Sequence, residues 1–355
     1  SKKYLPYGEI GLLSDSREMI IQLLSGVSCL FIDGYNKCLT IDCRTYPARG
    51  VSEPEKDKVM RGSRDGFVET LVFNTALIRR RIRDPKLIME ILTAGESSHT
   101  DIAMCYMEGR ADKKLIEKIR KSAELNTAIL DEVARQIHVG MSTQEIDDIV
   151  YRFTKEHGGI PAPLNYQGFP KSVCTSINNE ICHGIPDENI ILEEGDIINV
   201  DVSTILDGYF SDASRMFTIG DVSPEAERIV RVTKECVELG LKAAKPWGHL
   251  GDIAYAINSH AQENGYSVVE EIGGHGIGLE FHEDPFVCYV APKGSEMVLV
   301  PGMMFTIEPM INQGSPEFYV DEDNGWTVYT DDDGLSAQIE YMVLIKEDGV
   351  EVLTK

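Results

Sequence analysis

Two aspartates lie on either side of a predicted tight turn in the segment 196–220 and could bind metal ions together. The dipeptide Asp207-Gly208 between two alternating runs predicts a hairpin with a two-residue loop. In that hairpin Asp212 faces Ser203, so Asp212 and Asp201 share one face of the sheet as diagonal neighbours. Diagonal positions lie about 7–8 Å apart at the backbone, which lets both carboxylates reach the same one or two cations. A pair of solvated strand residues is the alternative.

Three later residues strengthen the case for a metal site. Glu308 in "GMMFTIEPMI" and Glu340 in "LSAQIEYMVLI" each interrupt an apolar, strand-like run. Acids are rarely buried unless they are paired or bound to a cation, although two solvent-facing strands would also explain them. His275 lies in the glycine-rich stretch "GGHGIGLEFHEDP". Four acids and one glycine-flanked imidazole together favour a metal site.

The charges of these side chains predict two divalent ions. Two such ions carry four positive charges, which the four carboxylates would balance. Carboxylate-rich ligation with a single imidazole suits Mn²⁺, Fe²⁺ or Co²⁺ at least as well as Zn²⁺. Paired ions about 3.5–4 Å apart can hold one hydroxide and polarise a carbonyl group, which is what hydrolysis of a peptide or an ester requires.

The whole chain limits the remaining possibilities. Its 355 residues are enough for two domains, and its net charge of −24 argues against direct nucleic-acid binding. No apolar run approaches the 18 or so residues of a membrane span, and the first ten residues lack the apolar stretch of a secretory signal. Eight scattered cysteines without CxxC pairs indicate reduced thiols. We therefore expect a cytoplasmic protein.

The elements that must position these residues fall into two segments. Residues 1–111 predict a small α/β unit, with a hairpin formed by "SCLFIDG" and "KCLTIDCR", helical spacing over 67–92 broken near Pro85, and a strand over 102–109. From 112 to 355 long helices alternate with pairs of strands. The most secure helix begins after Ser223, with Pro224 at its first position.

Five motifs in order show that residues from about 113 to 355 resemble a type I methionine aminopeptidase: "KSVCTSINNEICHGIP", "NVDVSTILDGYFSDASRMF", "GGHGIGLEFHEDP", "FTIEPM" and "GWTVYTDDDGLSAQIEYMVLI". The resemblance implies an α+β "pita-bread" fold with a curved antiparallel sheet, here preceded by the small α/β domain. It also implies removal of the N-terminal methionine from nascent polypeptides or short peptides. The ribosome is then a candidate partner.

The resemblance assigns roles to particular positions. Asp212 and Glu340 would bridge the two ions, His183 and His282 would stay unligated and hydrogen-bond the substrate, and Glu308 would also accept and shuttle a proton. The implied ligands of the two ions (Co²⁺, Mn²⁺, Fe²⁺ or Zn²⁺) are Asp201, Asp212, His275, Glu308 and Glu340. The implied walls of the methionine pocket are Tyr166, Phe169, Cys174, Phe281 and Trp326. Pro163 departs from the family, whose best-known members carry cysteine there.

Residues 1–111 resemble a different family, the soluble N-terminal part of the A-type subunits of spore germination receptors. The resemblance rests on the stretch from "LFIDGYNKCLTIDCR" to "LIRRRIRDPKL", and it identifies no partner for this segment. The segment contains a basic island that is either a solvated helix face or a site for an anion or a partner. The basic island comprises Arg61, Arg64, Arg79, Arg80, Arg81 and Arg83.

Three alternative functions remain open from the sequence. A proline-specific peptidase of the same fold would use the same five ligands, but its motifs differ from "GLEFHEDP" and "LSAQIEYM". A pita-bread binding protein that has lost catalysis is opposed by the presence of all five ligands. A germination-signalling adaptor would depend on residues 1–111.

Overall fold

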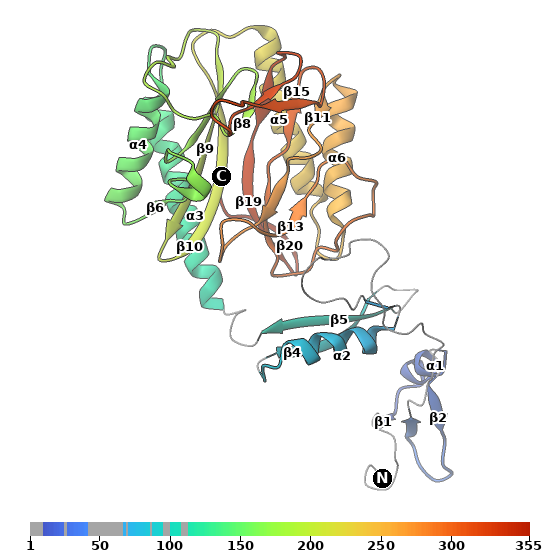
Figure 1. The fold of residues 1–355 in the computed structure, drawn as a ribbon. Helices are drawn as coiled ribbons and strands as arrows, with labels where there is room; N and C mark the ends of the chain where they lie inside the picture. Colours follow the sequence, from blue (N-terminus) through green and yellow to red (C-terminus); the bar gives the residue numbers. More distant parts are fainter. Residues whose placement is uncertain are drawn as a thin grey trace. The chain divides into compact units, whose positions relative to one another are not determined.

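The computed structural model describes residues 10–24, 27–41, 67–68, 70–85, 87–94, 100–107 and 113–355 (Figure 1). The chain divides into two compact units, Ser1–Arg110 and Ala111–Lys355. Among the described residues, no helix is both long and apolar enough to cross a membrane.

The first unit contains short strands and two helices. The predicted hairpin is confirmed, because β2 and β3 pair antiparallel in a three-stranded sheet of order β1-β3-β2. The helical spacing predicted past Pro85 is wrong: the helix ends at Arg81, and the apolar residues after the proline form a strand that pairs with β5. The elements are β1 (Ile10–Leu13), α1 (Ser16–Leu24), β2 (Ser28–Leu30), β3 (Cys38–Ile41), α2 (Leu71–Arg81), β4 (Leu87–Ala94) and β5 (Thr100–Met107). Arg61 and Arg64 of the basic island lie outside the described residues.

The second unit is built on a nine-stranded sheet that runs β13-β12-β14-β19-β10-β9-β6, with β20 paired to β19 and β7 paired to β9. Its long strands are β9 (Ile197–Leu206), β10 (Tyr209–Thr218) and β19 (Glu340–Lys346). The shorter strands of this sheet are β6 (Ile160–Pro161), β7 (Cys174–Ile177), β12 (Gly274–Gly276), β13 (Glu283–Val287), β14 (Met304–Ile307) and β20 (Gly349–Val352).

Four helices cover the two halves of this sheet (Figure 1). Apolar residues of α3 and α4 pack on β9 and β10 in one core, and those of α5 and α6 pack on β14 and β19 in another. The helices are α3 (Lys113–Gln136), α4 (Thr143–Glu156), α5 (Pro224–Ala243) and α6 (Leu250–Glu263). The sheet therefore has a helix pair behind each half, which leaves its other face for the polar residues described below.

Smaller elements complete the second unit. Strands β11, β15 and β18 form one three-stranded sheet, and β16, β17 and β8 form another. Their bounds are β8 (Glu180–Cys182), β11 (Ser267–Val268), β15 (Met310–Asn312), β16 (Phe318–Val320), β17 (Val328–Thr330) and β18 (Ser336–Gln338), and a 3-10 turn spans Tyr166–Gly168.

Local sequence signals explain how the elements begin and turn. Ser142 caps α4 through a capping box with Glu145, and Ser223 caps α5 just before Pro224, as predicted. The turn between β9 and β10 has positive φ at both central residues, 52° at Asp207 and 84° at Gly208. Positive φ at both positions is the geometry of a tight hairpin turn whose twist matches that of the strands.

Candidate metal centre and substrate pocket

One row of residues crosses four strands of the main sheet and carries two of the predicted ligands. Cys174 of β7 faces Asp201 of β9, Asp201 faces Ser214 of β10, and Ser214 faces Glu340 of β19. Facing residues share a side of the sheet, and Asp212 shares it too because it lies two residues from Ser214. The predicted pairing of Asp212 with Ser203 is confirmed. Strand pairing thus gathers Asp201, Asp212 and Glu340 on one face.

His275 and Glu308 reach the same place from the neighbouring strands β12 and β14. The Nε2 atom of His275 lies 3.8 Å from Oδ2 of Asp212 and 3.7 Å from Oε1 of Glu308. Ligand atoms of Asp212, His275 and Glu340 all lie within 4.8 Å of one another. Asp201 lies within hydrogen-bonding reach of Asp212 and Glu340. The structure therefore brings all five predicted ligands together.

The imidazole of His275 is held in the state that a metal ligand needs. Its Nδ1 lies 3.0 Å from the carbonyl oxygen of Gly276, so the Nδ1–H donates to that oxygen. Burial lowers the pKa of His275, which favours the neutral ring. The lone pair on Nε2 then faces the carboxylates, and an imidazole fixed through its other nitrogen is the usual arrangement of a ligating histidine.

Without a cation, the negative charges of the four buried carboxyl groups have few groups to stabilise them. Burial raises the pKa of Asp201 to about 7 and that of Glu308 to about 8. Burial, followed by repulsion from neighbouring acids, raises the pKa of Asp212 and of Glu340 well above the usual range. Within the described part of the chain, no donor reaches Oδ1 of Asp201, Oδ1 of Asp212 or Oε1 of Glu340. Buried, unpartnered carboxylate oxygens beside a neutral imidazole fit divalent cations.

A second set of side chains fixes Glu308, and the sequence reasoning missed it. The Thr306 hydroxyl donates to Oε1 at 2.5 Å, and Nε2 of Gln338 donates to Oε2 at 3.0 Å. The backbone N–H of Glu308 donates to the Tyr289 hydroxyl at 2.7 Å, and that of His275 donates to Oγ1 of Thr306 at 3.0 Å. Thr306 and Gln338 each lie two residues before a predicted ligand, so the two-residue period of a strand could have indicated that they share its face.

Two glycines beside His275 allow the strands to approach one another. A Cβ at Gly274 would lie 2.4 Å from the Thr306 carbonyl oxygen, and one at Gly276 would lie 2.2 Å from that of Asp284. Both distances are far below van der Waals contact. The bare backbone around His275 is therefore required by strand packing against β13 and β14.

The other two predicted histidines lie beside the cluster. The ring centroid of His282 lies 4.3 Å from that of His275, and its Nδ1 lies 3.0 Å from the Tyr166 hydroxyl. Burial lowers the pKa of His282 to about 4, with a further effect from His275. His183 follows β8 with a φ of 57°, and burial lowers its pKa to about 4 as well. Both rings are neutral at pH 7.

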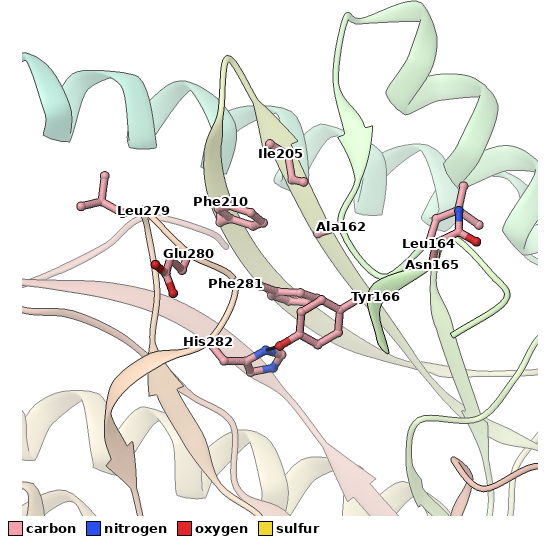
Figure 2. Close-up of a pocket in the computed structure, with 10 residues that line it drawn as sticks. All are labelled: Ala162, Leu164, Asn165, Tyr166, Ile205, Phe210, Leu279, Glu280, Phe281 and His282. Carbon is pink, nitrogen blue, oxygen red and sulfur yellow. Dashed lines mark hydrogen bonds between the residues drawn. The ribbon is translucent and has the colours of Figure 1, made fainter. Parts of the chain in front are cut away.

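The five predicted pocket residues fall into smaller groups. Tyr166 and Phe281 meet edge to face with centroids 4.8 Å apart, and Phe169 and Trp326 meet in the same way at 5.2 Å. Cys174 is buried opposite Asp201. A cavity of about 540 Å³ is lined by Tyr166 and Phe281, but the other three are not among the described residues that line it (Figure 2).

Pro163 contributes to the position of Tyr166. Its carbonyl oxygen accepts the backbone N–H of Tyr166 at 2.9 Å, in a tight turn where Asn165 has a φ of 67°. The departure from the family at this position therefore lies in the turn that presents one aromatic wall.

Comparison with known proteins supports this geometry. Residues 117–347 match the model of metallopeptidase family M24. The chain is 51% identical over 242 residues to methionine aminopeptidase A of Synechocystis sp., covering 68% of this chain and 95% of that protein. It is 43% identical over 240 residues to the methionine aminopeptidase of Escherichia coli (strain K12), covering 67% and 90%. The chain belongs to metallopeptidase family M24.

Solved structures of related proteins distinguish methionine aminopeptidases from proline-specific peptidases as relatives of this chain. The crystal structure of methionine aminopeptidase from Rickettsia prowazekii matches with a TM-score of 0.67 and 42% identity, covering 69% of this chain and 98% of that one. The prolidase from Pyrococcus furiosus matches with a TM-score of 0.55 and 25% identity, covering 69% and 64%. The α+β pita-bread fold is confirmed, and the methionine aminopeptidases are favoured over the proline-specific enzymes.

Family membership also makes this chain a metallo-aminopeptidase that uses divalent metal. Residues 1–144 match the model of the Bacillus/Clostridium GerA spore germination protein, which bears out the predicted resemblance of the first segment. That match continues past the boundary between the two units and through α3.

Proposed function

We propose that this chain removes the N-terminal methionine from nascent proteins and short peptides. The observation that carries the proposal is the buried cluster of four carboxyl groups and one neutral imidazole, with carboxylate oxygens that lack partners among the described residues. Curated relatives at 43–51% identity, covered over 90–95% of their own length, are methionine aminopeptidases. We place the reaction in the cytoplasm, on chains that emerge from the ribosome.

The five clustered residues would hold two divalent cations, namely Co²⁺, Mn²⁺, Fe²⁺ or Zn²⁺. Asp201, Asp212 and Glu340 each keep an oxygen without a donor among the described residues, and ligand atoms of Asp212, His275 and Glu340 lie within 4.8 Å of one another, so these side chains would hold the cations together with Glu308. The four carboxylates would balance the four positive charges. When bound, such ions lower the pKa of water and polarise a carbonyl group.

Glu308 would accept the proton of the attacking water and return it to the departing amine. A buried carboxylate that is held in a fixed orientation can serve as the general base for such a proton transfer. Thr306 and Gln338 bind its two oxygens and fix its orientation while the proton moves.

His282 and His183 would hold the scissile amide between them. The Tyr166 hydroxyl bonds Nδ1 of His282, which leaves the other ring nitrogen for the substrate. A neutral imidazole can donate one hydrogen bond to the carbonyl oxygen as negative charge develops on it. His183 would contact the amide in the same step.

The methionine side chain would lie among Tyr166, Phe169, Cys174, Phe281 and Trp326. The edge-to-face aromatic pairs support this assignment, because thioether sulfur packs favourably against aromatic rings. Cys174 adds a second soft surface, and it stays a thiol because burial raises its pKa well above the usual range.

Hydrolysis of the peptide Met-Gly-Met by the intact chain tests the function. We expect free methionine to appear after metal reconstitution and to disappear with EDTA, while Ala-Pro stays intact. His275→Ala should lose both bound metal and activity, whereas Glu188→Gln, at an exposed acid, should retain them. Cleavage of Ala-Pro in preference to Met-Gly-Met, or full turnover by His275→Ala, would contradict the proposal.

A further inference from the structure

The cavity beside His282 extends beyond the side chains to which the proposed function assigns a role. It lies between the loop at 162–166, the β9–β10 pair near its turn, and the loop at 279–282 (Figure 2). Most of its lining side chains are apolar, and several are accessible to solvent. The lining residues outside the proposed site that matter here are Ala162, Leu164, Ile205, Phe210 and Leu279.

This cavity shares two lining residues with the proposed methionine pocket. Tyr166 and Phe281 belong to both, and Figure 2 shows their rings side by side at its centre. His282, which would contact the scissile amide, also lines the cavity and is hydrogen-bonded to Tyr166. A substrate held by His282 therefore lies at the edge of this cavity.

The geometry of an extended peptide shows which substrate residue can enter. Side chains of an extended chain alternate between its two sides, so those of the first and third residues project in the same direction, about 7 Å apart. The first side chain, methionine, would contact Tyr166 and Phe281. The third side chain would project to the same side as the methionine and could reach the space beside Tyr166 and Phe281.

We infer that this cavity is a subsite for the third residue of the substrate and that it selects an apolar side chain there. The inference rests on the proposed aminopeptidase function. Leu279 is 45% exposed and would be covered by such a side chain, which favours binding because apolar surface leaves water. Glu280 is the single acid among the described lining residues, and its charge disfavours an acidic third residue.

The test compares tripeptides that differ at their third residue. Initial rates of methionine release by the intact, Mn²⁺-loaded chain are measured for Met-Ala-Leu, Met-Ala-Gly and Met-Ala-Asp, with the dipeptide Met-Ala as a reference. We expect kcat/KM to be roughly tenfold higher for the leucine than for the glycine peptide, as partial burial of one leucine side chain provides. The aspartate peptide should be the poorest of the three.

Substitutions of residues that line the cavity test whether the preference for leucine arises there. Ala162→Leu places a larger side chain in the cavity, so it leaves less room for a leucine and should bring the leucine-to-glycine ratio closer to one. Leu279→Ala changes a partly exposed side chain, so it keeps the test valid if the larger residue disturbs folding, and it should lower the ratio two- to threefold. Ile190→Ala, at an exposed residue outside the cavity, is the control and should leave the ratio unchanged.

Two results overturn the inference, and they are distinguishable from failure of the proposed function. Equal kcat/KM for all three tripeptides, with Met-Ala still cleaved, overturns the subsite alone. A leucine preference that survives both cavity variants does the same. If the loaded chain releases no methionine from Met-Ala itself, the proposed function fails, and the subsite fails with it.

Discussion

The buried acids predict that a rise in pH lowers their contribution to the stability of the metal-free protein and increases the stabilisation that a bound cation adds. The pKa of Asp201 is raised to about 7 and that of Glu308 to about 8, both by burial. Because these folded-state values exceed the usual unfolded values near 4, the metal-free folded chain binds extra protons between pH 4 and 8. The contribution of these two carboxyl groups to its stability is therefore fully present at acidic pH and is lost as the pH rises through 7 and 8.

The magnitudes of the pH effect and of the cation effect follow from how many protons and cations the folded and the unfolded chain each bind. Each carboxyl group with a raised pKa contributes up to about 1.4 kcal/mol per pH unit, so the two groups together give roughly 2 kcal/mol per pH unit near pH 7. A cation at one hundred times its Kd adds about 2.7 kcal/mol. For a unit of this size 1 kcal/mol corresponds to about 2–4 °C in Tm. We expect the cation to raise Tm by roughly 5–10 °C at pH 8 and much less at pH 6, where protons compete.

Tryptophan fluorescence is the suitable assay, because the chain has two tryptophans, Trp247 and Trp326, and both lie in the second unit. Melting curves at pH 6, 7 and 8 are compared with EDTA and with Mn²⁺. Glu340→Gln should remove the cation-dependent increase, and Glu188→Gln should keep it. If the Tm of the EDTA-treated chain falls from pH 8 to pH 6, or if the Mn²⁺ increase is the same at every pH, the explanation of the buried cluster is wrong.

Three further predictions concern the site and the elements around it. Thr306→Val removes the hydroxyl that donates to Glu308, so it should weaken Mn²⁺ binding in calorimetric titration and lower the unfolding free energy by about 1–3 kcal/mol. The control is Thr233→Val, because the buried Thr233 hydroxyl has no hydrogen-bond partner among the described residues, and it should change neither quantity. Gly274→Ala should lower Tm sharply, because its Cβ would overlap β14; a Tm within 2 °C or so of the parent would contradict the strand-packing argument. Ser142→Ala should lower the unfolding free energy in urea by about 1 kcal/mol without altering metal binding, since it removes only the cap of α4.

The sequence predicted those parts of the site that depend on local periodicity. The Asp207-Gly208 turn determines the register of β9 and β10, and that register places Asp201 and Asp212 on one face without any contribution from β19. Glu308 and Glu340 could be recognised because they interrupt apolar strands. Their position beside each other depends on the pairing of β14 with β19 and of β19 with β10, which joins distant parts of the chain.

Other features were out of reach because they depend on packing between loops. The short apolar run at 87–94 fits the period of a helix as well as that of a strand, and its pairing with β5 makes it a strand. The cavity beside His282 arises where the loops at 162–166 and 279–282 meet the β9–β10 pair, and no one of these segments indicates it alone.

Strand periodicity nevertheless extends from the ligands to the residues that support them. Thr306 lies two positions before Glu308, and Gln338 lies two before Glu340, so each shares the ligand's side of its strand or of the extended chain leading into it. Each is a buried polar residue that donates to the same carboxylate from its own direction. Burying a hydroxyl and an amide costs free energy unless they are hydrogen-bonded, and here the charged acceptor offsets that cost. The anion that binds the cations thus also stabilises the polar groups that hold it in place.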